Sequence, residues 1–214
     1  VTNGYYKGFT QGGIYTGRAK YICAPGLNCY SCPGAFNSCP IGSLQAVLDS
    51  RKFVISCYVF GFLMAFGALL GRLVCGWMCP FGLFQDLLYK IPLKFKRKNM
   101  PGHRYIAYLR WAVLLLLVII LPSAAVNAAG AGKPWFCEFL CPSGTFFGGI
   151  PLLALNPALR GAAGQKFIWK LIVLLLIMAV SVIYYRPFCK YLCPLGLIYG
   201  FFNPVALYHF EVDE

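Results

Sequence analysis

Three apolar runs, each close to twenty residues long, constrain the fold of this chain more than any other feature. They are YIAYLRWAVLLLLVIIL at 105–121, KFIWKLIVLLLIMAVSVIYY at 166–185 and KFVISCYVFGFLMAFGALLG at 52–71. A helix needs about 20 such residues to cross a bilayer. About a quarter of the residues in a soluble domain are charged, whereas here 12% are charged and 59% are hydrophobic. The runs predict an all-α integral membrane protein with about three transmembrane helices.

Basic residues outnumber acidic ones, 19 to 6, and they gather at the ends of the apolar runs. The densest stretch is YKIPLKFKRKNMPGHR at 89–104, which the positive-inside bias places in the cytoplasm. Basic and aromatic residues do not interleave as they would on a nucleic-acid-binding surface. The charge therefore predicts a membrane protein whose basic loop faces the cytoplasm, with lipid and not nucleic acid as its partner.

Six of the eleven cysteines form three C-x-x-x-C-P motifs, which are Cys75/Cys79, Cys137/Cys141 and Cys189/Cys193. If the second cysteine precedes a helix, proline occupies the first helical position, where its missing N–H has no cost. The free N–H groups and the positive dipole end of that helix then favour a negatively charged ligand. A [4Fe–4S] cluster held by four thiolates is such a ligand.

Other roles for these cysteines fit the spacing less well. Zinc also takes four thiolates, but its usual spacing is C-x-x-C in small soluble folds. Buried structural cysteines are common, although three copies of one motif argue against that interpretation for these six. It does fit Cys57, which stands alone inside an apolar run.

An internal repeat relates the first and third motifs. An apolar run, C-x-x-x-C-P-x-G and a short apolar stretch follow one another at matching spacing in residues 52–92 and 166–206. The short stretches, LFQDLLYKIP and LIYGFFNPV, are expected to form re-entrant half-helices, because irregular backbone at membrane depth is tolerated inside protein. The C-P-x-G core also begins at Cys39. The position four residues earlier, where a partner cysteine is expected, is Ala35, and the nearest cysteine that could replace it is Cys32 or Cys29.

The order of spans and motifs predicts two sites near opposite membrane faces. The cytoplasmic site should contain the first and third motifs, at a pseudo-twofold axis between the repeats. The opposite site should join Cys137 and Cys141 to Cys39 and either Cys32 or Cys29. In an alternative arrangement, the four N-terminal cysteines form their own centre, namely Cys23, Cys29, Cys32 and Cys39. We expect residues 1–52 to be an extracytoplasmic cysteine-rich segment and residues 53–214 to be the transmembrane iron–sulfur domain.

The motifs CGWMCPFGLFQDLLYKIP, RPFCKYLCPLGLIYGFFNP and CAPGLNCYSCPGAFNSCPIGSLQ resemble the NapH/NosR-like membrane polyferredoxins, from about residue 14 onwards. The resemblance implies an electron-transfer subunit of an oxidoreductase complex with two [4Fe–4S] clusters. It implies a cytoplasmic ferredoxin-like donor and a flavoprotein or cytochrome partner in or outside the membrane, with quinone or flavin in a partner. It also implies a multi-pass protein of a prokaryotic cytoplasmic (inner) membrane and a ferredoxin-like domain after residue 214. The chain begins at Val1 without methionine.

Other functions fit the sequence less well than electron transfer does. The Asn-Pro pairs at 156–157 and 203–204 are similar to those of aquaporin-like channels, but here they follow apolar stretches and three spans are too few. Haem is disfavoured because His103 and His209 lie outside the apolar runs. A structural membrane anchor with disulfide-bonded or zinc-bound cysteines remains the main alternative, and it would contain no iron. Only Asp86 and Glu138 are acids near a motif, which argues against catalysis on a substrate.

Overall fold

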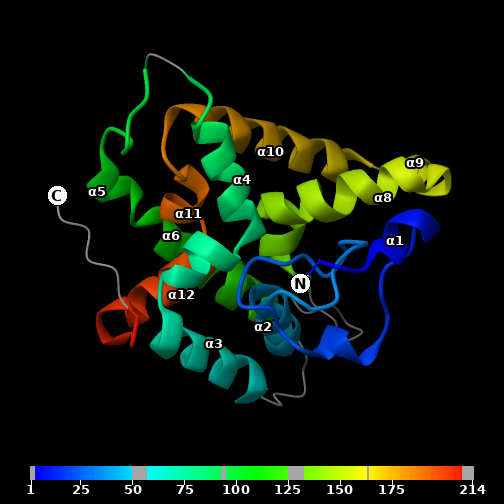
Figure 1. The fold of residues 1–214 in the computed structure, drawn as a ribbon, viewed down its shortest axis with the longest axis horizontal. Helices are drawn as coiled ribbons and strands as arrows, with labels where there is room; N and C mark the ends of the chain where they lie inside the picture. The colour runs from blue at the N-terminus through cyan, green and yellow to red at the C-terminus, as the bar shows by residue number, and fades with distance from the viewer. Residues whose placement is uncertain (1–2, 50–56, 93–94, 125–132, 163, 209–214) are drawn as a thin grey trace.

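A computed structural model describes residues 3–49, 57–92, 95–124, 133–162 and 164–208. These residues form helices and connecting loops, and no β-strand occurs among them. Figure 1 shows the helices stacked around a central region through which the N-terminal segment winds. The prediction of an all-α fold is therefore confirmed.

The described residues up to Tyr89 form α1 (Tyr6–Gln11), η1 (Arg18–Tyr21), α2 (Pro40–Asp49), α3 (Cys57–Leu70), η2 (Val74–Met78) and α4 (Pro80–Tyr89). The next group runs as α5 (His103–Ile106), α6 (Leu109–Ala112), η3 (Val113–Ile120), α7 (Leu121–Ala124), η4 (Phe136–Leu140), η5 (Gly144–Gly149) and α8 (Ile150–Leu155). The last group is α9 (Pro157–Ala162), α10 (Gln165–Ile183), α11 (Pro187–Tyr191), α12 (Pro194–Phe202) and η6 (Asn203–Val205).

Two helices are long and apolar enough to cross a bilayer by length and composition. One is the continuous helix His103–Ala124, which contains α5, α6, η3 and α7, and the other is α10. Both coincide with predicted spans. The third predicted span appears as α3, a shorter apolar helix of 14 residues, and its first residues, 53–56, lie outside the described part. The three-span topology stays a prediction.

The C-P-x-G sequences begin helices as their chemistry predicts. Cys79 and Cys193 are extended residues at the N-caps of α4 and α12, and proline follows each at the first helical turn. Proline is suited to this position because the N–H that it lacks would have no partner there. The helices after the cysteines therefore start at fixed points, and the sulfurs lie at their N-terminal ends.

Each repeat packs its long apolar helix against the short helix of the other repeat. Helix α3 of the first repeat packs on α12 of the second, and α10 of the second repeat packs on α4 of the first (Figure 1). Gly67 of α3 allows this approach, because a Cβ there would lie 2.6 Å from the ring of Phe202. This reciprocal packing is what a pseudo-twofold relation between the repeats requires, and it brings the first and third motifs together.

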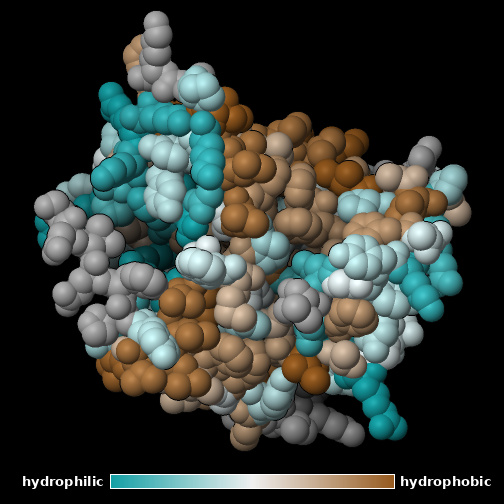
Figure 2. Space-filling view, viewed as in Figure 1, coloured by the Kyte–Doolittle hydropathy of each residue, from teal (hydrophilic) through white to brown (hydrophobic). Residues whose placement is uncertain are grey.

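The buried core surrounds the motifs, while the long helices keep large apolar side chains on the outside. Phe81, Phe136, Phe188 and Tyr199 are buried at 1% exposure or less. On α10, by contrast, large side chains are about half exposed, among them Ile168, Trp169, Ile172, Leu175 and Leu176. Figure 2 shows broad hydrophobic surface over the middle of the molecule and a hydrophilic region beside α5.

Candidate functional site

Eight of the eleven cysteines gather into two groups of four. Site A contains Cys29, Cys39, Cys137 and Cys141, and site B contains Cys75, Cys79, Cys189 and Cys193. Within each group the thiols lie close enough for their charges to interact. All eleven cysteines are free, without disulfides. Site B brings together the cysteines of the first and third motifs, and site A brings those of the second motif together with two N-terminal cysteines.

The two cysteines of each motif are presented by different local structures. Cys75 and Cys137 lie in the single π-helical turns η2 and η4. Such turns are rare and often occur at functional sites. Cys79 and Cys141 end these turns in an extended conformation, with ψ values of 112° and 107°. The change from a wide turn to an extended residue directs both sulfurs of a motif into one space.

A buried glutamine connects the two halves of site B. Gln85 of α4 is fully buried, and its Nε2 donates a hydrogen bond to Cys189 Sγ at 3.2 Å. Its Oε1 accepts a bond from the backbone N–H of Phe188 at 3.3 Å. The same side chain therefore holds the backbone that precedes the cysteine and donates to the sulfur itself.

Site A repeats this arrangement with Gln45 of α2, which is also fully buried. Its Nε2 donates to Cys137 Sγ at 3.4 Å, and its Oε1 accepts from the N–H of Phe136 at 3.1 Å. The sequence analysis missed both glutamines, although a signal existed. Each stands six residues after a C-P-x-G cysteine, Cys39 or Cys79. The shared spacing makes sites A and B two copies of one design.

Arg186 is the main cationic connection within site B. Its guanidinium pairs with Asp86 of α4 through two nitrogens and also donates to the carbonyl of Cys75 at 3.3 Å. The Asp86 carboxylate, which accepts these hydrogen bonds, raises the pKa of Arg186. The backbone of Arg186 has a φ of 47°, in the left-handed region, which costs a non-glycine residue about 1–2 kcal/mol. The ion pair fixes the second repeat against the first at the cluster-facing end of each.

Burial dominates the protonation of the grouped thiols. It raises the pKa of Cys39 and of Cys75 to about 12, and that of Cys137 to about 11. The next cause is in each case a thiol of the same site: Cys137 for Cys39, Cys79 for Cys75 and Cys29 for Cys137. These thiols are therefore protonated at neutral pH without metal. Because metals bind the thiolate, loading must displace the protons.

Three cysteines stand apart from the two groups. Cys32 is buried beside Cys29 and Lys20, and it does not line the cavity at site A. Cys23 lines that cavity, but its thiol interacts with Ser43 Oγ at 3.7 Å. Cys57 is exposed at the start of α3. Two cysteines could take the place of the partner that Cys39 lacks at position 35. Of these, Cys29 and not Cys32 faces the second motif.

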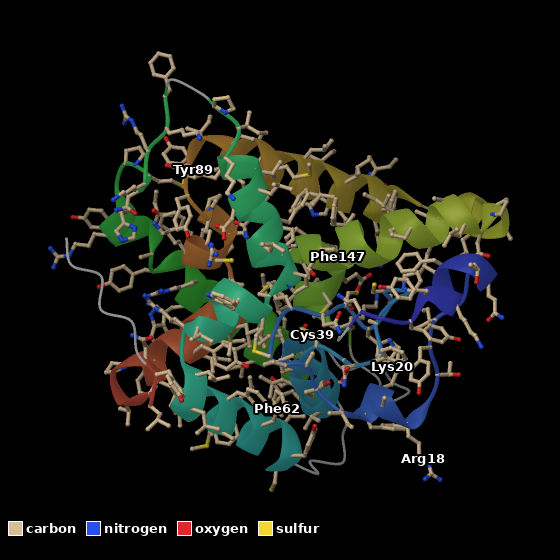
Figure 3. All side chains as sticks on the ribbon, in the orientation of Figure 1. Arg18, Lys20, Cys39, Phe62, Tyr89 and Phe147 are labelled. Carbon is tan, nitrogen blue, oxygen red and sulfur yellow. The ribbon has the colours of Figure 1, made fainter. Side chains whose placement is uncertain are left out.

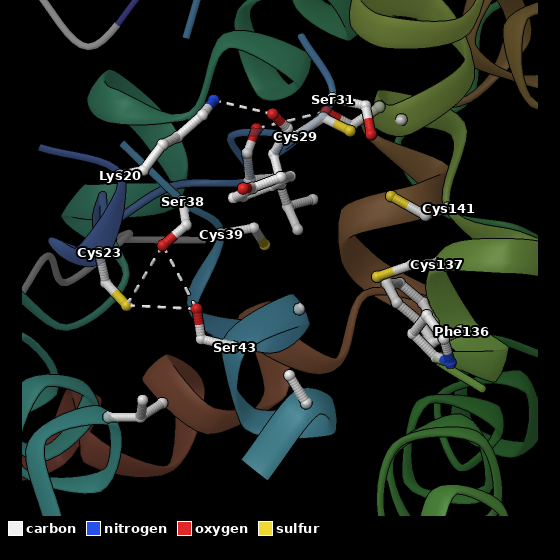
Figure 4. A pocket seen from close by; sticks show the side chains of 18 of the residues that line it. Lys20, Cys23, Cys29, Ser31, Ser38, Cys39, Ser43, Phe136, Cys137 and Cys141 are labelled. Carbon is white, nitrogen blue, oxygen red and sulfur yellow. Dashed lines mark hydrogen bonds between the residues drawn. The ribbon is translucent and has the colours of Figure 1, made fainter. Parts of the chain in front are cut away.

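Each site opens into a cavity. The cavity at site A has a volume of about 880 Å³ and contains Cys29, Cys39, Cys137 and Cys141 in its wall (Figure 4). The cavity at site B measures about 1180 Å³, with Cys75 and Cys189 in its wall. Figure 3 shows Lys20, from the wall of the first cavity, well apart from Tyr89, from the wall of the second, with Cys39 near the centre of the molecule. The two cavities share no lining residue.

A short N-terminal segment contacts both sites. The carbonyl of Leu27 accepts a hydrogen bond from Ser143, two residues after Cys141. The carbonyl of Pro25 accepts one from the Tyr199 hydroxyl at 2.9 Å. Burial raises the pKa of this tyrosine, and the thiols of Cys75 and Cys39 contribute next. Tyr199 therefore lies between the sites, six residues after Cys193 in the C-P-x-G spacing.

The thiol groups fit a cluster better than a single ion. Among the described residues, no three His, Cys, Asp or Glu side chains converge closely enough to bind one metal ion. Zinc would require that convergence, because its sulfur ligands lie about 2.3 Å from the metal. A four-iron cluster takes one thiolate at each iron, so its ligands stand further apart. Hydrogen bonds to sulfur, as from Gln85 and Gln45, are also a feature of cluster sites.

This combination of helical scaffold and paired four-thiol sites defines an iron–sulfur protein. The model of the 4Fe-4S binding domain family matches residues 57–99, 109–153 and 167–207, which is more than half of the chain. The chain therefore belongs to this family and carries [4Fe–4S] clusters. Each matched segment contains one C-x-x-x-C-P motif, whereas the N-terminal cysteines lie outside the match.

The curated relatives do not carry a functional description. The chain is 31% identical over 152 residues to an uncharacterized protein of Methanocaldococcus jannaschii, covering 68% of this chain and 54% of that protein. It is 26% identical over 150 residues to a second uncharacterized protein of that archaeon, covering 67% and 46%. The chain spans about half the length of these relatives. No solved structure matches it.

Proposed function

We propose that this protein transfers electrons through two [4Fe–4S] clusters, one held by site A and one by site B. The observation that carries the proposal is the repeated design, in which four thiols and one buried glutamine recur at both sites. Each cluster would supply one-electron exchange. The chain's own residues hold the sulfurs, donate hydrogen bonds to them and shield them from water.

A membrane location is supported by the exposure of the long helices. A helix in the core of a soluble protein would be mostly buried, yet only 17% of the most apolar window is buried in either His103–Ala124 or α10. Leucine and isoleucine side chains that are half exposed on these helices would be costly in water but favourable against lipid tails. Helix α3 would supply the third span.

The arrangement would place site B on the cytoplasmic side, beside the basic loop at 89–104, and site A nearer the other face. Within this proposal, residues 1–52 are extracytoplasmic and residues 53–214 form the membrane domain of a NapH/NosR-like subunit. A ferredoxin-like donor would meet site B, and a flavoprotein or cytochrome would meet site A. Accessible cavities at both sites support contact with two separate partners.

The contacts between the sites support a short route from one to the other. Tyr199 and the segment Pro25–Leu27 fill the space between them, and both are buried. Because the half-helices α4 and α12 draw the thiols inward, the gap is shorter than the full ~30 Å of a hydrocarbon core. The protein between the sites would position the clusters and exclude water.

Reconstituted vesicles test the proposal. Dithionite is added on one side, and a membrane-impermeant acceptor such as ferricyanide is enclosed on the other. We expect reduction of the acceptor, and we expect it to stop when Cys75 and Cys189 are both replaced by serine. The exposed Cys57→Ser variant is the matched control and should conduct normally. Transfer that continues unchanged in the double variant would refute the proposal, as would purified protein without iron or sulfide.

A further inference from the structure

The cavity at site B is strongly basic, which sets it apart from the cavity at site A. Six basic side chains lie in its wall: Arg72, Lys98, His103, Arg110, Arg186 and Lys190. No aspartate or glutamate of the described part of the chain lines it. At site A the basic lining residues are Lys20 and Lys170 alone.

The charge of a cluster does not explain this difference. Both sites present four thiols and one glutamine, so clusters bound at each would carry similar negative charge. Site A meets that charge with Lys20, which lies near Cys29, and with Lys170, which lies near Cys137. At site B, Arg72 and Arg186 lie near Cys75 in the same way. The cations in excess are Arg110, Lys98 and Lys190, and they call for another anion.

Several of these cations lack a counter-charge. Arg186 is paired with Asp86, but Arg72 and Arg110 have no acidic partner among the described residues and lie close enough to repel each other. Lys190 and Lys98 form a second repelling pair. Like charges held together in one cavity are unfavourable unless an anion lies between them.

Arg110 gives the most specific signal. Its Nε is buried and has no hydrogen-bond partner among the described residues. Unsatisfied buried donors are rare in folded proteins and often mark an absent ligand. Arg110 also lies in the apolar helix His103–Ala124, and a charged residue within such a helix is costly and usually functional. Gly200 of α12 leaves room for Arg72, since a Cβ there would lie 3.0 Å from Nη2 of the guanidinium.

We propose that this cavity binds a phosphate group, with Arg72 and Arg110 as its main ligands and Lys98 and Lys190 at its rim. Guanidinium groups match phosphate oxygens with paired hydrogen bonds, which makes phosphate a better fit than a halide. The inference goes beyond electron transfer, because it assigns a second ligand to the molecule. The phosphate lies next to Cys75 and Cys189, within reach of site B.

The cavity is larger than a single phosphate and has aromatic walls. Trp77, Tyr89 and Tyr185 line it, and its volume of about 1180 Å³ exceeds what inorganic phosphate needs. The bound group therefore belongs to a larger molecule. Two sources share this chemistry: the headgroup of an anionic phospholipid, or a soluble phosphate-bearing molecule that approaches site B from the cytoplasm.

Two measurements on the iron-loaded protein in nanodiscs separate these sources. In phosphatidylcholine discs, inorganic phosphate is titrated by calorimetry; in discs containing phosphatidylglycerol, retained lipid is counted by native mass spectrometry. Arg110→Gln should weaken the binding of phosphate or phosphatidylglycerol about tenfold or more, as expected for loss of a charge-assisted hydrogen bond. Arg104→Gln is the matched control, because it removes an equal charge from the exposed surface of the same helix.

Each outcome decides the inference. Loss of phosphate binding in Arg110→Gln supports a soluble ligand, and loss of retained phosphatidylglycerol supports a lipid. No binding of either probe by the native protein, or equal loss in Arg104→Gln, overturns it. If Arg110→Gln does not fold, Arg72→Gln is measured in its place. Iron and sulfide are assayed in every sample, so failure of the cluster proposal is recognised separately from failure of phosphate binding.

Discussion

Sites A and B share a scaffold but differ at their openings. In both, a half-helix begins after a C-P-x-G cysteine and sends a glutamine to a cysteine of the facing motif. Site B is tied further by the Arg186–Asp86 pair and opens into a basic cavity. Site A opens into a mainly apolar one that contains Cys23 and two lysines.

The comparison distinguishes the residues that bind a cluster from the residues that face partners in the cavity walls. The features common to both sites, four thiols and a buried amide, are those needed to bind and shield a cluster. The features present at one site alone lie in the cavity walls, where partners approach. The residues that bind a cluster are therefore repeated within the chain, whereas the residues that would recognise a partner differ between site A and site B.

The largest expected effect comes from removing ligands at one site only. Replacing Cys75 and Cys189 by serine should remove about half of the iron and sulfide, since site A shares no ligand with site B. Replacing Cys39 and Cys137 should remove the other half. Iron and sulfide analysis with EPR of each variant measures this, and the Cys57→Ser variant should keep the full content.

The single variant Cys137→Ser sharpens the assignment of site A. If Cys23, Cys29, Cys32 and Cys39 formed their own centre, this change would leave the iron content intact. With Cys29, Cys39, Cys137 and Cys141 as ligands, the site A signal should be lost or altered. Cys32→Ser should have little effect on iron content, because Cys32 faces Lys20 and not the second motif.

The ion pair of site B offers the next largest effect. Arg186→Gln removes the guanidinium that pairs with Asp86 while leaving a side chain that keeps the same backbone strain. Breaking a buried pair costs 3–5 kcal/mol; because the side chains of Arg186 and Asp86 are 16% and 25% exposed, we expect about 2 kcal/mol. Thermal unfolding in detergent should show a clear fall in the midpoint.

The matched control for Arg186 is Lys166, which pairs with Glu138 near site A. Its side chain is 62% exposed, so solvent screens the pair. Lys166→Gln should therefore change stability by less than about 1 kcal/mol. Equal losses in the two variants would show that the pair at site B has no special structural role.

A pH dependence should distinguish the metal-free protein from the loaded one. Without metal, burial raises the pKa of Cys39 and Cys75 to about 12, against an ordinary thiol value of 9.0. Above pH 9 the unfolded chain releases protons that the folded chain keeps, so stability should fall from pH 9 towards pH 12. Loaded protein carries no such protons, and its melting temperature should be less sensitive over this range. Metal-free Cys39→Ser/Cys75→Ser should lose part of the dependence.

The sequence predicted the features that repeat. The C-x-x-x-C-P spacing led to the joining of Cys75, Cys79, Cys189 and Cys193, because proline after the second cysteine fixes a helix start and the repeats match in length. It also predicted that Cys39 belongs with the second motif. The helical character of the long apolar runs followed from their length and composition.

Other features could not be predicted because they depend on tertiary contacts without regular spacing. Cys29 was not separable from Cys32 on the sequence, since the loop from 23 to 38 has no periodicity that orients its thiols. The position of Tyr199 between the sites depends on the reciprocal packing of α3 and α12. The role of Arg110 has no motif to mark it, and its unpartnered buried Nε follows from tertiary packing alone.

The smallest expected effect tests whether the sites are equivalent. Gln85→Leu and Gln45→Leu each remove one hydrogen bond to a ligand sulfur while keeping similar bulk. Such bonds stabilise the more negative, reduced state, so each loss should lower the reduction potential of its own cluster. A bond of about 1 kcal/mol corresponds to about 40 mV for one electron. Redox titration followed by EPR should show the shift at site B in one variant and at site A in the other. Similar shifts in reduction potential at the two sites support a common design. If the potential of only one cluster changes, the two sites share a backbone arrangement but the glutamines do not set both potentials.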